Sequence, residues 1–223
     1  MAIEEGLNKP KTTVGPFVNG KPTTVSFFSA QQLQDSPFLT SLLTTINLAY
    51  AKGEGSKPEL GFSKTDRLSS ISGIFDYIRD DPEAFLVVLS HQESCDVIAT
   101  ATCRRYLAPD ESKSPWLCSH NVEDGTEEWE IRLLATHPSA QGCGAAGFIM
   151  KATEQEVIER FDRKRKAIDT HASTRLKMVL CAIKELYPEF YMRRGYGVDY
   201  VHEGGEERKF NILFMSKTLA TLP

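Results

Sequence analysis

The sequence predicts a mixed α/β fold, in which helices flank one central, mixed and mostly antiparallel sheet. The chain has 223 residues, enough for one domain with a substantial core and few for two. Apolar residues follow helical spacing in some segments, and alternate or run continuously in others. The predicted order is a strand, two helices, three strands, a helix, a strand, a short helix and two strands.

The composition predicts a globular protein and excludes several classes of function. Hydrophobic residues make up 41% and charged residues 25% of the chain, which are ordinary values for a folded domain. The formal net charge of −4 provides no basic field for nucleic acid. The polar, acidic N-terminus differs from a secretory signal peptide, and no apolar run reaches the roughly 20 residues that span a bilayer.

The cysteines indicate a reducing environment. The five cysteines are scattered and never form a C-x-x-C pair, which argues against a disulfide framework and against a zinc site. The histidines show no metal-ligand spacing. We therefore expect a cytoplasmic protein with no metal, no membrane segment and no nucleic-acid partner.

The N-terminal third predicts an arm, a strand and two helices. Residues 1–22 hold three of the eleven prolines and are expected to form an extended arm before a domain over 23–223. Residues 23–29 are typical of a strand. Ser36 and Pro37 are a good N-cap and first helical residue, and the apolar spacing after them predicts a helix ending near Gly53. Apolar residues at helical spacing predict a second helix over 64–79.

The remaining elements follow from apolar runs separated by turn residues. Residues 84–90 and 96–104 are expected to form an antiparallel pair, followed by a loop over 107–126 that is rich in Pro, Ser, Asp and Gly. The other predictions are strands over 129–136, 177–183, 197–202 and 211–217, a long helix over 145–166 and a short helix over 190–194.

The most informative stretch is HPSAQGCGAAG, residues 137–147, between a predicted strand and a predicted helix. Such a turn exposes backbone N–H groups at the positive end of the helix, a geometry that binds phosphate without cationic side chains. Read as a G-x-G-x-x-G dinucleotide fingerprint, it lacks the right context. Five residues separate it from the strand, and the 76 residues after Gly147 are too few for the rest of that domain.

Read instead as Q-x-x-G-x-A over Gln141, Gly144 and Ala146, the turn resembles the signature of the GNAT superfamily of N-acetyltransferases. The resemblance covers residues 84–217 and implies acetyl-CoA (coenzyme A) as the cofactor. It implies that the preceding strand bonds the pantetheine arm through Leu134, Ala135 and Thr136. The implied diphosphate site is the turn itself, made of Gln141, Gly142, Cys143, Gly144, Ala145, Ala146 and Gly147.

The segment FYMRRGY, residues 190–196, resembles the family's F/L-Y-x-x-x-G-F/Y segment near the C-terminus. In relatives its tyrosine, here Tyr191, lies near the thioester sulfur. A half-buried packing role is the alternative for this tyrosine. The chain departs from the family at Lys184, where many relatives carry asparagine, so a cofactor contact inherited from that asparagine is not expected.

The resemblance implies direct transfer of the acetyl group to a primary amine, with no enzyme nucleophile. A carboxylate on the strand before the turn would remove the amine's proton, and Glu130 is the proposed general base, with Glu127 and Glu128 as rivals in an exposed loop. Tyr191 is the proposed general acid, and a backbone N–H near Leu134 or Ala135 would polarise the carbonyl. A polar position on the solvent face of the strand is the alternative for Glu130.

The sequence therefore predicts an N-acetyltransferase, with a non-catalytic acyl-CoA-binding module as the alternative. We expect a small-molecule amine acceptor rather than a protein, because the acidic balance favours cationic partners. The identity of that amine stays open, because loops such as 107–126 shape acceptor sites and vary freely.

Overall fold

The fold is described from a computed structural model, which covers residues 9–78, 80–94, 96–106, 120–167, 174–205 and 209–221. The eight strands follow the order β1-β2-β3-β4-β5-β6-β8-β7. Strands β1 to β4 pair antiparallel in sequence, as do β6, β8 and β7, whereas β5 and β6 run parallel. The predicted mixed, mostly antiparallel sheet is confirmed. The chain divides into two compact units, which are described in turn.

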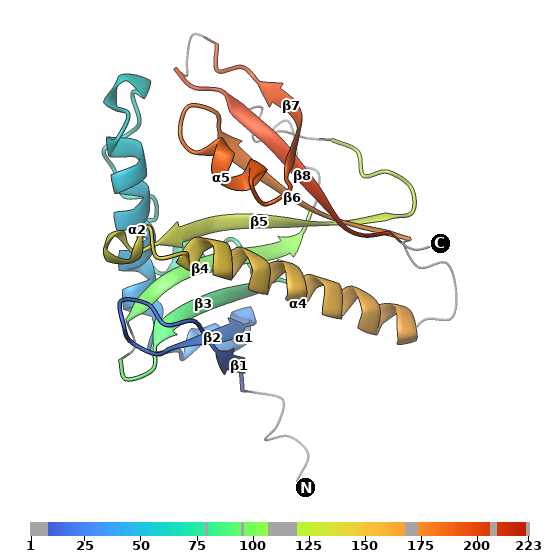
Figure 1. The fold of residues 1–223 in the computed structure, drawn as a ribbon, viewed down its shortest axis with the longest axis horizontal. Helices are drawn as coiled ribbons and strands as arrows, with labels where there is room; N and C mark the ends of the chain where they lie inside the picture. The colour runs from blue at the N-terminus through green and yellow to red at the C-terminus, as the bar shows by residue number, and fades with distance from the viewer. Residues whose placement is uncertain are drawn as a thin grey trace, which may run out of the picture. The chain divides into compact units, whose positions relative to one another are not determined.

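The first unit comprises residues 1–52, 64–104 and 132–153. Its strands are β1 (Lys11–Val14), β2 (Thr23–Phe28), β3 (Phe85–His91) and β4 (Val97–Arg105), which lie side by side in Figure 1. The sequence predicted the last three strands within one residue at each end. Strand β1 was not predicted. It forms because residues 11–14 of the expected extended arm pair with β2.

Three helices cover one face of these strands. They are α1 (Ala30–Gln34), α2 (Leu39–Gly55) and α3 (Ser72–Phe75), and their buried side chains, such as Leu33, Ile46 and Ile74, share one core with apolar residues of β2, β3 and β4. Helix α1 was not predicted, although a capping box of Ser29 and Gln32 starts it. Polar groups also dock α2, because Thr45 donates a hydrogen bond to the Val97 carbonyl at 2.9 Å.

The predicted helix over 64–79 is wrong. Of its described residues, only Ser72–Phe75 are helical. The side chain of Asn47 on α2 donates to the carbonyl of Leu68 and accepts from its N–H, both at 2.9 Å. These bonds replace helical ones at Leu68, while its side chain is buried in the core. Apolar spacing alone therefore mimicked a helix in a segment that a distant asparagine holds in a loop.

Strand β5 (Thr126–Thr136) and helix α4 (Ala145–Ala167) each contribute residues to both units. The strand begins three residues before its predicted start, and the helix matches its prediction within one residue. The 3₁₀ turn η2 (Pro138–Ala140) precedes α4, so the predicted strand, turn and helix are all present. Of the predicted loop over 107–126, residues 107–119 lie outside the described residues, and β5 begins at its last residue, Thr126.

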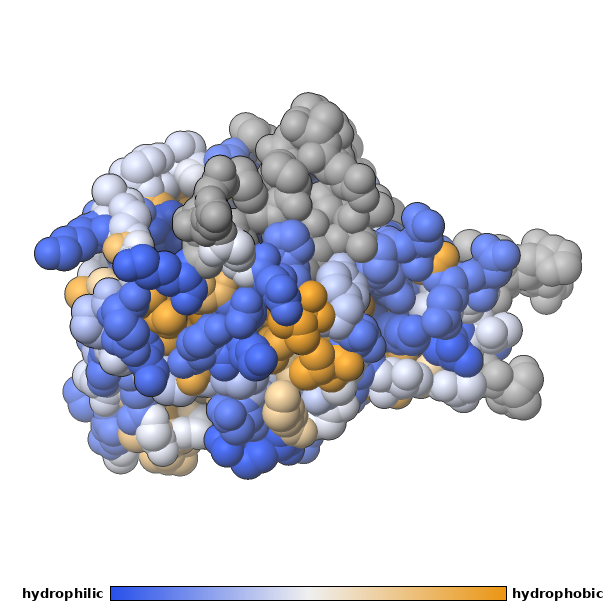
Figure 2. Space-filling view, turned by 90° about the horizontal axis from the view of Figure 1, so that it is seen from above, coloured by the Kyte–Doolittle hydropathy of each residue, from blue (hydrophilic) through white to orange (hydrophobic). Residues whose placement is uncertain are grey.

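The second unit comprises residues 53–63, 105–131 and 154–223. It contains η1 (Pro58–Leu60), β6 (Arg175–Ile183), α5 (Pro188–Met192), β7 (Gly197–His202) and β8 (Ile212–Thr221). A small core forms around Tyr106, Val179 and Phe214. On the face that Figure 2 shows, hydrophilic residues predominate and apolar ones form small patches. None of the helices in the described ranges is long and apolar enough to span a membrane.

Candidate functional site

The glycine-rich turn has the backbone geometry that a phosphate requires. Gly142 and Gly144 have φ values of +85° and +82°, in a region that favours glycine, and α4 begins directly after them at Ala145. The first N–H groups of a helix have no partner within it and lie at its positive end. A Cβ atom built on either glycine meets no atom within 4 Å. The turn therefore has open space beside both glycines, directly before the start of α4.

Side chains on both flanks hold the turn in place. Gln141 donates its amide hydrogen to the Thr136 carbonyl at 3.2 Å, which ties the turn to the end of β5. Asn19, from the N-terminal arm, donates to the Ser139 carbonyl at 3.2 Å and accepts from the Cys143 thiol at 3.3 Å. Cys143 is exposed, and its contact with Asn19 ties the turn to the N-terminal arm. No pattern in the sequence singles out Asn19, because its partners Ser139 and Cys143 lie 120 and 124 residues further along the chain.

Strand β5 is distorted just before the residues proposed to bond pantetheine. Leu133 has φ +47°, an uncommon value for a residue with a side chain. Its side chain is nevertheless buried in the core of the first unit, and packing therefore holds the backbone in this conformation. Ala135 and Thr136 are buried, and Leu134 is half-buried. The Thr136 hydroxyl oxygen is buried with no hydrogen-bond partner among the described residues, which indicates a missing polar partner.

Three glutamates at the start of β5 are buried, and for Glu127 and Glu128 this corrects the expectation of an exposed loop. The exposed fractions of Glu127, Glu128 and Glu130 are 7%, 5% and 9%. Alternation along a strand places Glu128 and Glu130 on one face and Glu127 on the other. The alternative role of Glu130 as a solvated residue on the strand's outer face is therefore wrong. Several glutamates close together in a sequence normally indicate a solvent-exposed segment. Only the folded structure shows that these three side chains are buried.

Glu127 is engaged by one hydrogen-bond donor and two cations. Its Oε1 accepts the Trp129 indole N–H at 2.8 Å and lies 2.9 Å from an Arg105 guanidinium nitrogen. The ammonium nitrogen of Lys164 on α4 lies 3.6 Å from its Oε2. Both oxygens of Glu127 are engaged by these neighbours, and we assign it a structural role.

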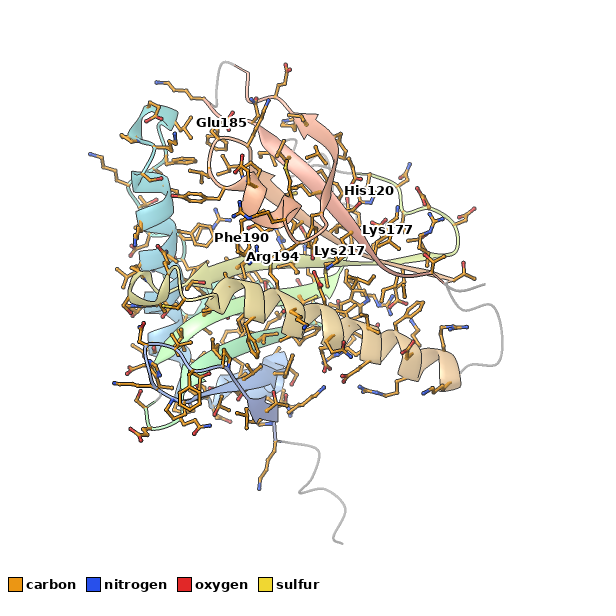
Figure 3. The ribbon with its side chains drawn as sticks, viewed as in Figure 1. His120, Lys177, Glu185, Phe190, Arg194 and Lys217 are labelled. Atoms are coloured by element: carbon orange, nitrogen blue, oxygen red, sulfur yellow. The ribbon has the colours of Figure 1, made fainter. Side chains whose placement is uncertain are left out.

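Glu128 pairs with a histidine that the sequence did not single out. His120, which Figure 3 labels, places its Nε2 2.5 Å from Glu128 Oε2. Its ring stacks on Tyr106 at 4.4 Å between centroids and meets Phe214 edge-on at 4.5 Å. The carboxylate thus orients an imidazole that packs against two aromatic rings, an arrangement suited to proton transfer. Five scattered histidines without motif spacing gave no means of choosing this one.

Tyr106 closes the cluster and lies in the field of both same-face glutamates. Burial raises the pKa of its phenol, and the charges of Glu130 and Glu128 raise that pKa further, against a lowering by a hydrogen bond from the His120 backbone. That backbone N–H donates to the phenol oxygen at 3.1 Å. The phenol therefore stays protonated at neutral pH and keeps its own hydrogen for donation.

Tyr191 lies on α5, which spans Pro188–Met192 and so begins and ends two residues before the short helix predicted over 190–194. Its ring is half-buried, edge-on to Phe190 at 5.1 Å and to Tyr196 at 6.4 Å between centroids. Arg194 fixes the short helix, because its guanidinium lies 3.7 Å over the Phe190 ring and donates to the Phe190 carbonyl at 2.6 Å (Figure 3). Gly195, with φ +87°, lies in the turn that follows this helix.

A buried carboxylate on α4 braces the same region. The hydroxyl of Tyr196 donates to Glu154 at 2.9 Å, and Lys217 lies 2.6 Å from the other oxygen of Glu154. The hydroxyl of Tyr196 thus has a structural role. Tyr191 is therefore the tyrosine of this segment that we consider for proton transfer.

Replacing Glu127 by glutamine should lower the free energy of unfolding by about 1–3 kcal/mol, because Arg105 and Lys164 lose a buried charged partner. Glu123→Gln is the matched control, since Glu123 also pairs with two cations, Arg175 and Lys177, but is 59% exposed. We expect that control to cost less than about 0.5 kcal/mol. Urea unfolding measures both, and equal losses would contradict a structural role for Glu127.

Comparison with known proteins identifies the fold. No model of a known protein family matches the sequence, and no curated protein matches it. Solved structures do match. The ribosomal-protein-S18-alanine N-acetyltransferase from Escherichia coli aligns with a TM-score of 0.56 and 11% identity, covering 90% of this chain and 96% of that chain.

Two further structures agree. An aminoglycoside 6'-N-acetyltransferase complexed with coenzyme A has a TM-score of 0.54 and 15% identity, and covers 89% of this chain and 98% of its own. A protein assigned to the GNAT family from Desulfovibrio desulfuricans has a TM-score of 0.52 and 14% identity, and covers 88% and 99%. At this identity the likeness shows the fold alone, and the predicted GNAT fold is confirmed.

Proposed function

We propose that this protein, which has the GNAT fold, transfers an acetyl group from acetyl-CoA directly to a primary amine. The turn of residues 141–147 carries the proposal, because its two glycines with positive φ open the start of a 23-residue helix to an anion. A non-catalytic acyl-CoA-binding module would need the same turn and is the alternative. The buried carboxylates of β5 favour catalysis, because a binding module has no use for a proton acceptor.

Several features support coenzyme A as the ligand of this turn. The unpaired N–H groups at the start of α4 and the glycines before them suit the diphosphate, with Gln141 holding the turn to β5. The buried Thr136 hydroxyl, without a partner among the described residues, suits the polar pantetheine arm, together with Leu134 and Ala135. Lys184 replaces the asparagine common in relatives, so no cofactor contact is assigned there.

We assign the three steps of the proposed reaction to different groups of the protein: removal of the amine's proton, polarisation of the carbonyl and protonation of the leaving sulfur. Acetyl-CoA supplies the acetyl group as a reactive thioester. Glu130 accepts the proton of the amine, directly or through a water molecule. A backbone N–H near Leu134 or Ala135 polarises the carbonyl, and the Tyr191 phenol protonates the sulfur as it leaves. Glu128, oriented with His120, is the next candidate for the base, because it shares the strand face of Glu130.

Isothermal calorimetry tests the cofactor. We expect measurable binding of acetyl-CoA and none of NAD or NADP, because the turn lacks the context of a dinucleotide domain. Coenzyme A should also raise the melting temperature, since a ligand at 100 times its dissociation constant stabilises the folded state by about 2.7 kcal/mol. Binding of NAD(P) without acetyl-CoA would overturn the proposal.

Thiol release with a panel of amines then separates the enzyme from the binding module. Acetyl-CoA binding without amine-dependent thiol release across the panel would favour the module.

A further inference from the structure

The N-terminal arm contains a tight hairpin over residues 18–21. Val18 and Lys21 exchange two backbone hydrogen bonds of 3.0 Å around Asn19 and Gly20, whose φ values are +52° and +75°. Positive φ at both central residues is what a type I′ hairpin loop requires, and Asn-Gly is the pair that best adopts it. The Val18 side chain, with 1% exposed, anchors the hairpin in the core of the first unit. The backbone of the hairpin is therefore fixed.

The tip of this hairpin is joined to the glycine-rich turn. The Asn19 amide donates to the Ser139 carbonyl at 3.2 Å, just before the turn of residues 141–147, and accepts from the Cys143 thiol within it at 3.3 Å. A Cβ built on Gly20, or on either glycine beside Cys143, meets no atom within 4 Å. The hairpin tip and the turn are thus in contact, and both border open space.

Two side chains next to Asn19 are available to a ligand. The exposed fraction of Phe17 is 73%, and Lys21 is exposed as well. Each is two residues from Asn19, so its Cα lies within about 7 Å of the Asn19 Cα. Among the described residues, neither side chain has a hydrogen bond, an ion pair or a ring contact. An aromatic ring and a cation therefore lie on a fixed backbone beside the proposed diphosphate site.

The charge of this segment is opposite to that of the chain. From residue 6 to residue 34 there are three lysines and no aspartate or glutamate, whereas the net charge of the protein is −4. The turn of residues 141–147 contains no cationic side chain, because backbone N–H groups suffice for a diphosphate. Coenzyme A also carries a 3′-phosphate on its ribose, with a charge of about −2 at neutral pH. The arm brings a lysine to the turn that lacks one.

We propose that the arm binds the 3′-phosphoadenosine half of coenzyme A, with Phe17 stacking on the adenine and Lys21 pairing with the 3′-phosphate. The adenosine follows directly after the diphosphate in coenzyme A, so a ligand held at residues 141–147 brings its adenosine close to the hairpin. Asn19 contributes by keeping the hairpin on the turn. The inference rests on the proposed cofactor and adds a second part to its site.

The 3′-phosphate is tested by calorimetry on the full chain with coenzyme A and dephospho-coenzyme A, which differ in that phosphate alone. We expect coenzyme A to bind about 3- to 10-fold more tightly, the effect of one ion pair to a phosphate. Lys21→Gln should remove this preference. Lys52→Gln is the matched control, because it loses the same charge from an exposed position at the end of α2 and should keep the preference.

The adenine contact is tested with variants of Phe17. Phe17→Ala should weaken both ligands by about 5- to 50-fold, as loss of base stacking does, and should leave their ratio unchanged. Phe17→Tyr should retain native affinity, because it keeps the ring. Val14→Ala is the matched control, since Val14 is 80% exposed on the same arm. In an Asn19→Gly background Phe17→Ala should cost less, because the hairpin is no longer held on the turn.

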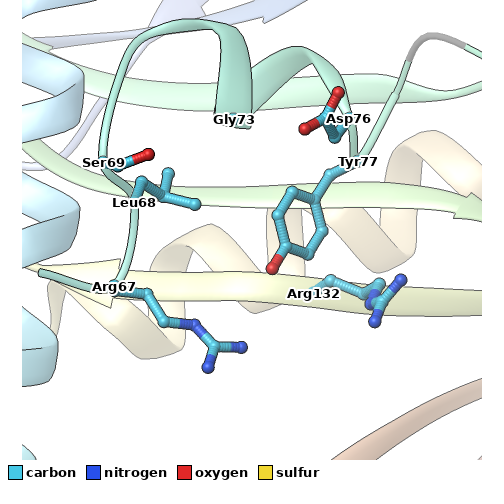
Figure 4. Close-up of a pocket in the computed structure, with 7 residues that line it drawn as sticks. All are labelled: Arg67, Leu68, Ser69, Gly73, Asp76, Tyr77 and Arg132. Carbon is cyan, nitrogen blue, oxygen red and sulfur yellow. The ribbon is translucent and has the colours of Figure 1, made fainter. Parts of the chain in front are cut away.

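A cavity of the first unit provides another group of cations for comparison. Its volume is about 380 Å³, and Figure 4 shows two arginines in its lining together with an acid, Asp76. The complete lining is Arg67, Leu68, Ser69, Gly73, Asp76, Tyr77 and Arg132. If the 3′-phosphate bound there, Arg67→Gln would remove the preference for coenzyme A. We expect this variant to keep it.

Each contrary result has one meaning. The inference is overturned if the wild type binds both ligands equally, if the preference survives Lys21→Gln or is lost in Arg67→Gln, or if Phe17→Ala has native affinity or no larger effect than Val14→Ala. Melting temperatures confirm that the variants are folded, as expected for substitutions of exposed side chains. Failure of the wild type to bind either ligand would instead overturn the proposed function.

Discussion

Gly144→Val is expected to abolish acetyl-CoA binding while the protein stays folded. The native φ of +82° is strained for a residue with a branched Cβ, at a cost of about 1–3 kcal/mol. A Cβ at this position meets no protein atom within 4 Å, so the core is not disturbed. The added side chain would instead fill the space over the first N–H groups of α4. Loss of two charge-assisted bonds predicts binding weaker by about 10²–10⁴-fold in calorimetry.

Gly205→Val is the matched control for that experiment. Gly205 has φ +63° and also has nothing within 4 Å of an added Cβ, but it lies in the turn between β7 and β8. We expect a similar loss of stability and unchanged affinity for acetyl-CoA. A folded Gly144→Val protein with native affinity would show that the diphosphate binds elsewhere.

Glu130→Gln and Tyr191→Phe should each slow acetyl transfer by about 10²–10⁴-fold, but with different pH dependence. Glutamine keeps the shape of Glu130 and cannot accept the amine proton. The loss should therefore shrink as pH rises, because more of the amine arrives already deprotonated. Phenylalanine removes only the phenol oxygen of Tyr191. That loss should persist at high pH, because the departing sulfur still lacks its donor.

Full pH–rate profiles measured by thiol release distinguish these outcomes. Both variants should bind acetyl-CoA normally, since the turn of residues 141–147 is untouched. Native rates for Glu130→Gln below the pKa of the amine would exclude Glu130 as the base and make Glu128, with His120, the next candidate. If Tyr191→Phe has no effect on the rate, the next hydroxyl to test is that of Tyr106, whose pKa is raised by burial and by the charge of Glu130.

The elements that local sequence determines were predicted well. The turn over 137–147 could be placed because its glycines, the apolar strand pattern before it and the helical pattern after it are all visible close together in the sequence. The structure then shows that Gly142 and Gly144 adopt positive φ. Strands β3, β4 and β7 follow directly from short apolar or alternating runs between turn residues. In each case the interactions that define the element lie close together along the chain.

The features that distant contacts determine were missed. The side chain of Asn47 forms two hydrogen bonds with the backbone of Leu68, 21 residues away. These bonds hold Leu68 in a loop, where the apolar spacing had predicted a helix. Asn19 braces a turn about 120 residues further along the chain. His120 becomes significant only because folding brings it onto Glu128 and Tyr106. Each depends on one polar side chain without a motif, so no pattern in the sequence distinguishes it from its neighbours.

Strand β1 protects an edge that would otherwise invite aggregation. Strand β2 is largely buried and rich in Val and Phe, and a bare edge of this kind templates pairing with another chain. The four residues of β1 cover it with a short, exposed strand that contains Lys11 and two threonines. The arm thus covers the edge of β2, in addition to supplying Asn19 to the glycine-rich turn. A fragment that began at residue 23 would expose the edge of β2 and should aggregate more readily than the full chain.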